Sequence, residues 1–284
     1  MGSLPVVARA ALHYWEEPCI SGTRGSGAVF FSGCSLHCVY CQNYAISERR
    51  FGKRLSIEEL AGLYRRLEEQ GAHNINLVTA DHFIPAVVQS LRLYRPRVPV
   101  VYNCSGYESA QMLAALNGLV DIYLPDFKYA DEAVAARYSN APDYFSVATE
   151  AIQEMIRQTG RPVFDDEGLL RKGTLVRHLI LPGHTRNSIG VLRWLAEHVR
   201  DEVLVSLMGQ FLPQGKVNSQ TFSELNRRIT KREYQKVEKA LFDLRLEGFV
   251  QDLASAQEQY IPSFQLEGVE EPENLKDIGK EGLS

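Results

Sequence analysis

The sequence predicts an α/β protein in which helices cover a parallel β-sheet. Two observations support this fold class. Short, almost continuously apolar runs recur along the chain, and an amphipathic stretch of helical length lies between one run and the next. This alternation is typical of parallel strands joined by helical crossovers. About six or seven such units are visible, which indicates a full or partial barrel, although an open doubly wound sheet has the same local pattern.

The length and composition of the chain agree with one α/β unit. The chain has 284 residues, of which 45% are hydrophobic, so it can bury a sizeable core. Its formal charge of −4 gives no basic field, and we expect no nucleic-acid partner. No apolar run reaches the roughly 18 residues of a membrane span. No apolar stretch behind basic residues indicates a signal peptide, so neither a membrane nor secretion is expected.

The first units of the alternation surround a cluster of cysteines. An apolar strand at residues 29–31 delivers the chain to these cysteines. A helix is predicted over residues 56–70, because Ser56 and Glu59 form a capping-box pattern at its start and Gly71 can close its end. A buried strand at residues 75–79 follows.

The later units repeat the same order. They are predicted as helices near residues 84–94, 109–116, 150–158 and 188–200, which lead into strands at 98–102, 120–124, 175–181 and 203–208. Beyond the last strand, Thr230 and Glu233 form another capping box, which opens a charged helix running to about residue 246.

Four segments follow from this pattern. Residues 1–28 form an N-terminal approach segment, and residues 29–215 form the barrel core. Residues 216–264 form a C-terminal helical extension. Residues 265–284 are polar and acidic with few apolar anchors, so a flexible tail is expected there.

Three of the five cysteines lie within eight residues, in the string Cys34-Ser-Leu-His-Cys38-Val-Tyr-Cys41. An odd number of clustered cysteines does not suit a secreted disulfide framework, so reduced thiols and a cytoplasmic location are expected. Three thiolates in a C-x₃-C-x₂-C spacing can bind three irons of a four-iron cluster. The fourth iron then stays open to a substrate or cofactor, as in catalytic metal sites that keep an open position.

Other uses of these cysteines remain open. A zinc site could combine the three thiolates with His37 or a remote histidine, although the second pair of ligands that is usual in structural zinc sites is not visible. Cys19 or Cys104 could instead supply a fourth ligand, which would make the protein a non-catalytic Fe–S electron carrier.

The cysteine string, with Tyr40 before its last cysteine, resembles the signature of the radical S-adenosylmethionine (SAM) superfamily. The longer string over residues 29–43 is similar to the pyruvate formate-lyase activating enzymes. The flanking sequence HYWEEPCISGTRGSG, at residues 13–27, resembles their PflX-like branch. The resemblance covers residues 13–264 and implies a partial (βα)₆ barrel of the TIM type with a C-terminal helical extension.

This resemblance implies a radical SAM oxidoreductase. In the family a [4Fe–4S] cluster is bound by the three cysteines, and the amino and carboxylate groups of SAM chelate the unique iron. An electron donor such as flavodoxin or ferredoxin reduces the cluster, and SAM breaks into methionine and a 5′-deoxyadenosyl radical that abstracts a hydrogen atom. The branch implies a glycyl-radical protein as substrate. A small molecule or another protein remains an equal alternative.

The resemblance also implies which residues contact SAM, most of them at strand ends on the catalytic face of a barrel. Related enzymes carry a Gly-Gly-Glu segment after the second strand. This chain lacks it, and Thr79 and His82 are expected to act instead. Asp126 and Lys128 match a Leu-Asp-Leu-Lys string, with an ion pair that anchors a loop as the structural alternative. Arg177 matches an Arg-x-x-x-x-Pro-Gly strand. The other expected contacts are Tyr40, Asn43, Asn103, Ser105 and Gln210.

Two loops are expected to act as mobile lids over the site. They cover residues 16–26, before the cysteines, and residues 213–223, after the last strand. Both are rich in glycine, serine and polar residues, which favours movement.

Overall fold

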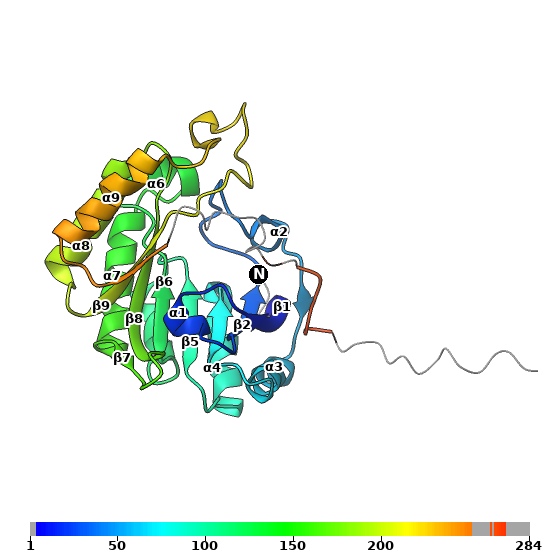
Figure 1. Cartoon of the computed structure of the whole chain (residues 1–284). Helices are drawn as coiled ribbons and strands as arrows, with labels where there is room; N and C mark the ends of the chain where they lie inside the picture. The colour runs from blue at the N-terminus through cyan, green and yellow to red at the C-terminus, as the bar shows by residue number, and fades with distance from the viewer. Residues whose placement is uncertain (1–3, 252–261, 263, 271–284) are drawn as a thin grey trace, which may run out of the picture.

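The chain folds around one curved β-sheet (Figure 1). The computed structural model describes residues 4–251, 262 and 264–270. The strands are β1 (Val6–His13), β2 (Ser26–Phe31), β3 (Lys53–Arg54), β4 (Ile75–Val78), β5 (Val100–Cys104), β6 (Ile122–Pro125), β7 (Val163–Phe164), β8 (Leu170–Leu179), β9 (Val203–Met208) and β10 (Gly248–Val250). Their order in the sheet is β10-β9-β8-β6-β5-β4-β2-β1-β3, and β7 pairs with β8.

The central part of this sheet confirms the predicted partial (βα)₆ barrel. Strands β2, β4, β5, β6, β8 and β9 are parallel neighbours, and the short β10 extends them. Strands β1 and β3 are antiparallel additions at the other edge. Within the described strands, no hydrogen bonds join the β3 edge to the β10 edge, so the barrel stays open.

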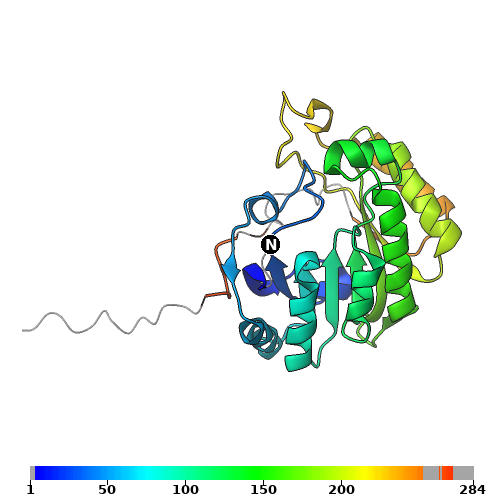
Figure 2. The same ribbon diagram turned by 180° about the vertical axis from the view of Figure 1, so that it is seen from behind.

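Helices cover the outer face of the sheet, as Figure 2 shows from behind. They are α1 (Pro18–Ser21), α2 (Tyr44–Ser47), α3 (Ile57–Glu69), α4 (Ile84–Leu93), α5 (Ala110–Leu113), α6 (Glu132–Ser139), α7 (Tyr144–Thr159), α8 (Thr185–His198) and α9 (Lys231–Asp243), of which α1 and α2 lie elsewhere. Both predicted capping boxes are present, at the starts of α3 and α9. None of the described helices has the length and apolar character that a membrane crossing requires.

Helix α1 fills the inside of the barrel instead of covering it. Its Cys19 and Ile20 are buried against inward-facing side chains of β5, β6, β8 and β9, among them Val101 and Leu175. The expectation that residues 16–26 form a mobile lid is therefore wrong for α1, whose Cys19 and Ile20 are packed into the core, while Gly22, Thr23 and Arg24 are exposed. The N-terminal approach segment likewise contains β1 and the first residues of β2.

The buried side chain of Ile20 gives a test of this packing. Ile20 is fully buried, so Ile20→Ala should lower the free energy of unfolding by about 2–5 kcal/mol through lost burial and a cavity. Leu93→Ala is a matched control, because Leu93 is 58% exposed and should change stability by no more than about 0.5 kcal/mol. Urea unfolding of both variants measures the difference. Equal stabilities would show that α1 does not form part of the core.

The C-terminal region differs from its prediction in two ways. The extension contains α9 as expected, but it also returns to the sheet as β10, parallel to β9. The start of the predicted flexible tail is docked on β1: Ala10 N–H donates to the Glu267 carbonyl at 2.8 Å, and Val269 is 6% exposed. The remainder of the tail, residues 271–284, lies outside the described residues.

Candidate active site

The cysteine loop, which we define as residues 34–41, follows β2 and is held by contacts with two other segments of the chain. Its backbone is fixed by two hydrogen bonds, from Val39 N–H to the Tyr138 carbonyl at 2.9 Å and from Lys216 N–H to the Val39 carbonyl at 2.7 Å. Gly215 has a φ of +66°, and a Cβ on it would lie 2.6 Å from the Val39 oxygen. The loop at residues 213–223 therefore packs against the cysteine loop at Gly215, where the close approach of the two backbones leaves room only for glycine.

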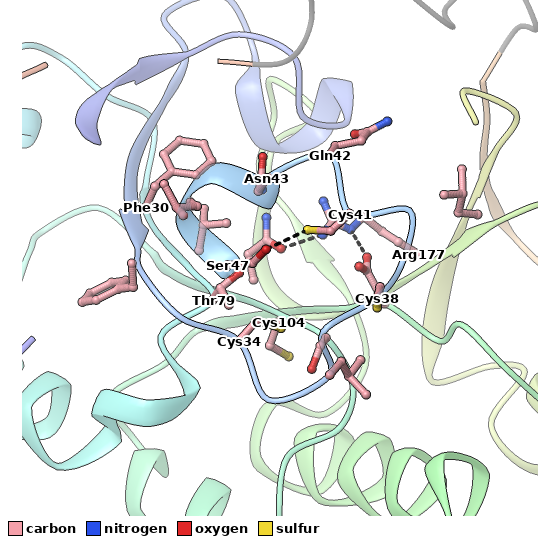
Figure 3. A pocket seen from close by; sticks show the side chains of 18 of the residues that line it. Phe30, Cys34, Cys38, Cys41, Gln42, Asn43, Ser47, Thr79, Cys104 and Arg177 are labelled. Carbon is pink, nitrogen blue, oxygen red and sulfur yellow. Dashed lines mark hydrogen bonds and ion pairs between the residues drawn. The ribbon is translucent and has the colours of Figure 1, made fainter. Parts of the chain in front are cut away.

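The three cysteines line one cavity of about 240 Å³ at the carboxyl ends of the strands (Figure 3). Among the described residues, no three side chains of the His, Cys, Asp and Glu types already surround a single point as ligands of one ion. Three cysteine thiols at one cavity suit a four-iron cluster, in which each cysteine binds a different iron. His37 instead pairs with Glu48, at 3.1 Å, so the Cys₃His37 zinc alternative gains no support. The donor set therefore fits a [4Fe–4S] cluster.

Hydroxyl groups donate hydrogen bonds to two of these cysteines. Ser47 Oγ donates to Cys41 Sγ at 3.3 Å, and Ser139 Oγ donates to Cys38 Sγ at 3.0 Å. The Tyr129 hydroxyl lies 2.7 Å from Ser139 Oγ, and the Tyr40 hydroxyl lies 2.7 Å from that of Tyr129. Each hydroxyl has one proton, and Ser139 gives its proton to sulfur. The chain therefore runs from Tyr40 through Tyr129 and Ser139 to Cys38.

The bond from Ser139 predicts an electrochemical effect. A hydrogen bond to a ligand sulfur stabilises the more negative, reduced cluster, so Ser139→Ala should lower the reduction potential while the cluster stays bound. Ser188→Ala is the control, because Ser188 is also fully buried but lies on α8, and its hydroxyl has no hydrogen-bond partner in the described structure. Spectroscopic redox titration measures both. An unchanged potential in Ser139→Ala would show that this bond does not reach the cluster.

A partly buried charge network lines the same cavity, at the ends of β6 and β8. Arg177 donates to Asp126 Oδ1 at 2.9 Å, to Glu16 Oε2 at 3.1 Å and to Asn103 Oδ1 at 2.6 Å. Lys128 forms an ion pair with the other oxygen of Asp126. Arg177, at the end of β8, thus connects the ends of β5 and β6 with the segment before α1.

The charges in this network hold one another ionised. Burial opposes the charged form of Asp126, but the adjacent Arg177 and Lys128 outweigh burial and lower the pKa of this carboxyl. Burial also opposes protonation of Arg177, yet the carboxylates of Asp126 and Glu16 raise its pKa. The pKa of Lys128 is likewise raised, since Asp126 outweighs the effect of burial. The network therefore presents fixed charges to the cavity.

Glu16 is the functional-site residue that the sequence did not reveal. Its Oε1 accepts from Asn76 Nδ2 at 3.1 Å and from Asn103 Nδ2 at 3.2 Å, while its Oε2 accepts from Arg177. Glu16 lies in the string HYWEEP, which begins at the last residue of β1 and has no periodicity of its own. Its partners on β4, β5 and β8 are separated from it by 60 or more residues, so no local signal could have found it.

Nine of the ten residues predicted to contact SAM line the cavity of the three cysteines. They are Tyr40, Asn43, Thr79, Asn103, Ser105, Asp126, Lys128, Arg177 and Gln210. The tenth, His82, lines a second, smaller cavity together with Cys34, so the structure does not bring it to the first one. Tyr40 contributes its ring to the wall, while its hydroxyl points to Tyr129.

Thr79 has an unusual backbone at the end of β4. Its φ is +60°, a left-handed conformation that β-branched residues rarely adopt and that costs on the order of 1–3 kcal/mol. Its N–H donates to the Asn103 carbonyl at 2.8 Å, which holds the conformation in place. Glycine would adopt this backbone without strain, so Thr79→Gly is compatible with the conformation.

The two remaining cysteines occupy different places. Cys19 lies on α1 in the interior of the barrel and does not line the cavity. Cys104, at the end of β5, does line it, but burial and the neighbouring carboxyls of Glu108 and Asp81 raise the pKa of its thiol well above the ordinary value. Cys104 also lies far along the chain from the C-x₃-C-x₂-C string that supplies the other three thiols.

A partial (βα)₆ barrel with three loop cysteines and a charged network around one cavity defines a radical SAM type of site. The family comparison agrees, since the model of the radical SAM superfamily matches residues 28–195. The chain belongs to this superfamily.

Individual relatives share the fold at low identity. The uncharacterized protein MJ0674 of Methanocaldococcus jannaschii is 28% identical over 240 residues, which cover 81% of this chain and 64% of that protein. A radical SAM methyltransferase from Sphaerobacter thermophilus has a TM-score of 0.54 at 14% identity, over 80% of this chain and 66% of its own. Methylornithine synthase has a TM-score of 0.52 at 17% identity, over 84% and 65%. The chain thus spans slightly less than two thirds of these relatives.

Proposed function

We propose that this protein reductively cleaves SAM at a [4Fe–4S] cluster bound by Cys34, Cys38 and Cys41. One observation carries the proposal: these three thiols and the network around Arg177 line the same cavity. When bound, the cluster and SAM supply an electron and a 5′-deoxyadenosyl radical that abstracts a hydrogen atom. An oxygen-sensitive cluster requires a reducing compartment, so the location that we propose is the cytoplasm.

The residues of the chain bind, orient and shield these groups. Lys128 and Arg177 offer fixed positive charge for the SAM carboxylate, and Asp126 and Glu16 hold the two cations in position. Polar groups at the ends of β4 and β5, from Thr79, Asn103 and Ser105, are donors and acceptors for the amino and ribose groups. Apolar side chains such as Phe30 and Leu36 line the rest of the cavity and exclude water.

We propose a glycyl-radical protein as the substrate. The resemblance of the cysteine loop to activating enzymes supports this choice. Further support comes from α1, whose Cys19 and Ile20 are buried in the interior of the barrel, so that this helix does not act as a lid over an incoming peptide loop. A small molecule or another protein is the alternative substrate class.

Anaerobic incubation with SAM and reductant tests both the cleavage of SAM and the proposed substrate. The reconstituted enzyme should release 5′-deoxyadenosine, detected by mass spectrometry, even without substrate. Addition of candidate glycyl-radical proteins from the same organism should give the doublet of a glycyl radical in electron paramagnetic resonance. Cleavage of SAM without that doublet in any candidate would leave the radical chemistry standing and reject the glycyl-radical protein as substrate.

A further inference from the structure

Cys34 lies in the wall between two cavities. One is the cavity of the three cysteines, and the other is a smaller cavity of about 150 Å³ beside the cysteine loop. The smaller cavity is lined by Gly33, Cys34, Ser35, His37, Ser47, Arg50 and His82. Three of these, Arg50, His37 and His82, are exposed, and Arg50 carries the fixed positive charge among them. The Cys34 end of the cluster site is therefore approached from outside through a basic rim, separately from the cavity that holds SAM in our proposal.

The rim continues into a basic segment, which we define as residues 49–54 with the sequence Arg-Arg-Phe-Gly-Lys-Arg. Its four cations are all exposed, and in the described structure none of them forms an ion pair. The preceding acid, Glu48, is already neutralised by His37 at 3.1 Å and Lys216 at 3.0 Å. This concentration of positive charge is local, because the whole chain carries a net charge of −4.

The basic segment is fixed to the cysteine loop. Ser32 Oγ donates to the Phe51 carbonyl, and Gly52 is packed so closely that a Cβ would lie 2.9 Å from the Ser32 hydroxyl. Lys53 and Arg54 then pair with β1 as strand β3. Phe51 is 41% exposed between the cations and offers an apolar anchor. The charges are thus held in place next to the cluster site.

We propose that the small cavity and the basic segment together form the docking face for a small, acidic electron-carrier protein. This inference rests on the proposed function. The reduced carrier gives up one electron, which enters the cluster at its Cys34 end, and no proton or chemical group is transferred. Fixed positive charge attracts an acidic carrier and orients it during encounter. Entry at this face keeps the carrier away from the cavity where the substrate reacts.

The test compares two reductants on the reconstituted full-length protein. Flavodoxin hydroquinone serves as the acidic carrier, and photoreduced 5-deazariboflavin serves as an uncharged small reductant. The double variant Arg50→Glu/Lys53→Glu should slow cluster reduction by flavodoxin on the order of tenfold or more at low salt. It should leave reduction by deazariboflavin unchanged. The rate in the unmodified protein should fall as ionic strength rises.

A matched control has the same change of charge elsewhere. Arg161→Glu/Lys172→Glu alters two exposed cations near the start of β8, at the opposite end of the barrel from the cysteine loop, and should keep the rapid flavodoxin reaction. Equal rates in both double variants would overturn the docking face, as would slowing with both reductants or no reduction of the unmodified protein by flavodoxin. If the unmodified protein bound duplex DNA or RNA and the Arg50→Glu/Lys53→Glu variant did not, the face would be reassigned to nucleic acid. Failure of the proposed function has its own outcome, a cluster that deazariboflavin reduces without cleavage of SAM.

Discussion

Replacing any one of Cys34, Cys38 and Cys41 with alanine is expected to abolish the iron–sulfur absorbance of the anaerobically reconstituted protein. Each thiolate is expected to bind a different iron of the cluster, so the loss of any one removes a ligand. All three side chains line the same cavity, so the loss of one opens a corner of the cluster to solvent. Iron and sulfide analysis together with the visible spectrum measures the result, and SAM cleavage should disappear in parallel.

Cys19→Ala and Cys104→Ala are the matched controls for this prediction. Cys19 is packed inside the barrel, and Cys104 lies outside the C-x₃-C-x₂-C string, so both variants should keep the cluster. Circular dichroism establishes that each variant is folded. A folded Cys104→Ala protein without a cluster would mean that four cysteines bind it, which contradicts the three-ligand assignment.

Replacing Arg177 with methionine is expected to have the second large effect. The substitution keeps a long side chain but leaves Asp126 and Glu16 as largely buried carboxylates without their shared cation. Removal of one partner from a buried ion pair typically costs about 3–5 kcal/mol. We also expect SAM affinity to fall while the cluster stays bound, because the network orients Lys128 and Asn103 in the cavity.

Arg157→Met is the control for this second prediction. Arg157 also forms an ion pair, with Glu154 at 2.6 Å, but its side chain is 60% exposed. Exposed pairs contribute no more than about 1 kcal/mol, so stability and SAM binding should change little. Denaturant unfolding and equilibrium dialysis with labelled SAM measure the two quantities. Unchanged SAM affinity in a folded Arg177→Met protein would remove this residue from the binding site.

The parts of the fold that sequence predicted well are those with local signals. Helices α3 and α9 begin where their capping boxes place them, because the Ser56–Glu59 and Thr230–Glu233 pairs act within four residues. Strand β1 was not foreseen, since its sequence VVARAALH lacks regular alternation and its pairing depends on β2. The start of α7 was placed six residues too late, at 150 instead of Tyr144.

The residues of the candidate site likewise divide into those that the local sequence predicted and those that depend on tertiary contacts. Residues at strand ends could be grouped in advance, because the carboxyl ends of parallel strands meet on one face, and this rule located Asn103, Asp126 and Arg177 correctly at one cavity. The contribution of Glu16 and the left-handed backbone of Thr79 depend on tertiary contacts, which leave no trace in the local sequence. For His82, position after a strand was a poor guide, since its side chain lies on the far side of the cysteine loop.

The central claim is that three cysteines hold the cluster and leave one iron open to SAM. Electron paramagnetic resonance of the reduced, reconstituted protein tests it most directly, with spectra recorded before and after addition of SAM. Coordination of SAM to the open iron should change the cluster spectrum, and SAM with isotopic labels in its amino and carboxylate groups should show hyperfine coupling to the cluster. A spectrum that stays the same at saturating SAM, without such coupling, would indicate a cluster with a full set of protein ligands. The protein would then be an Fe–S electron carrier.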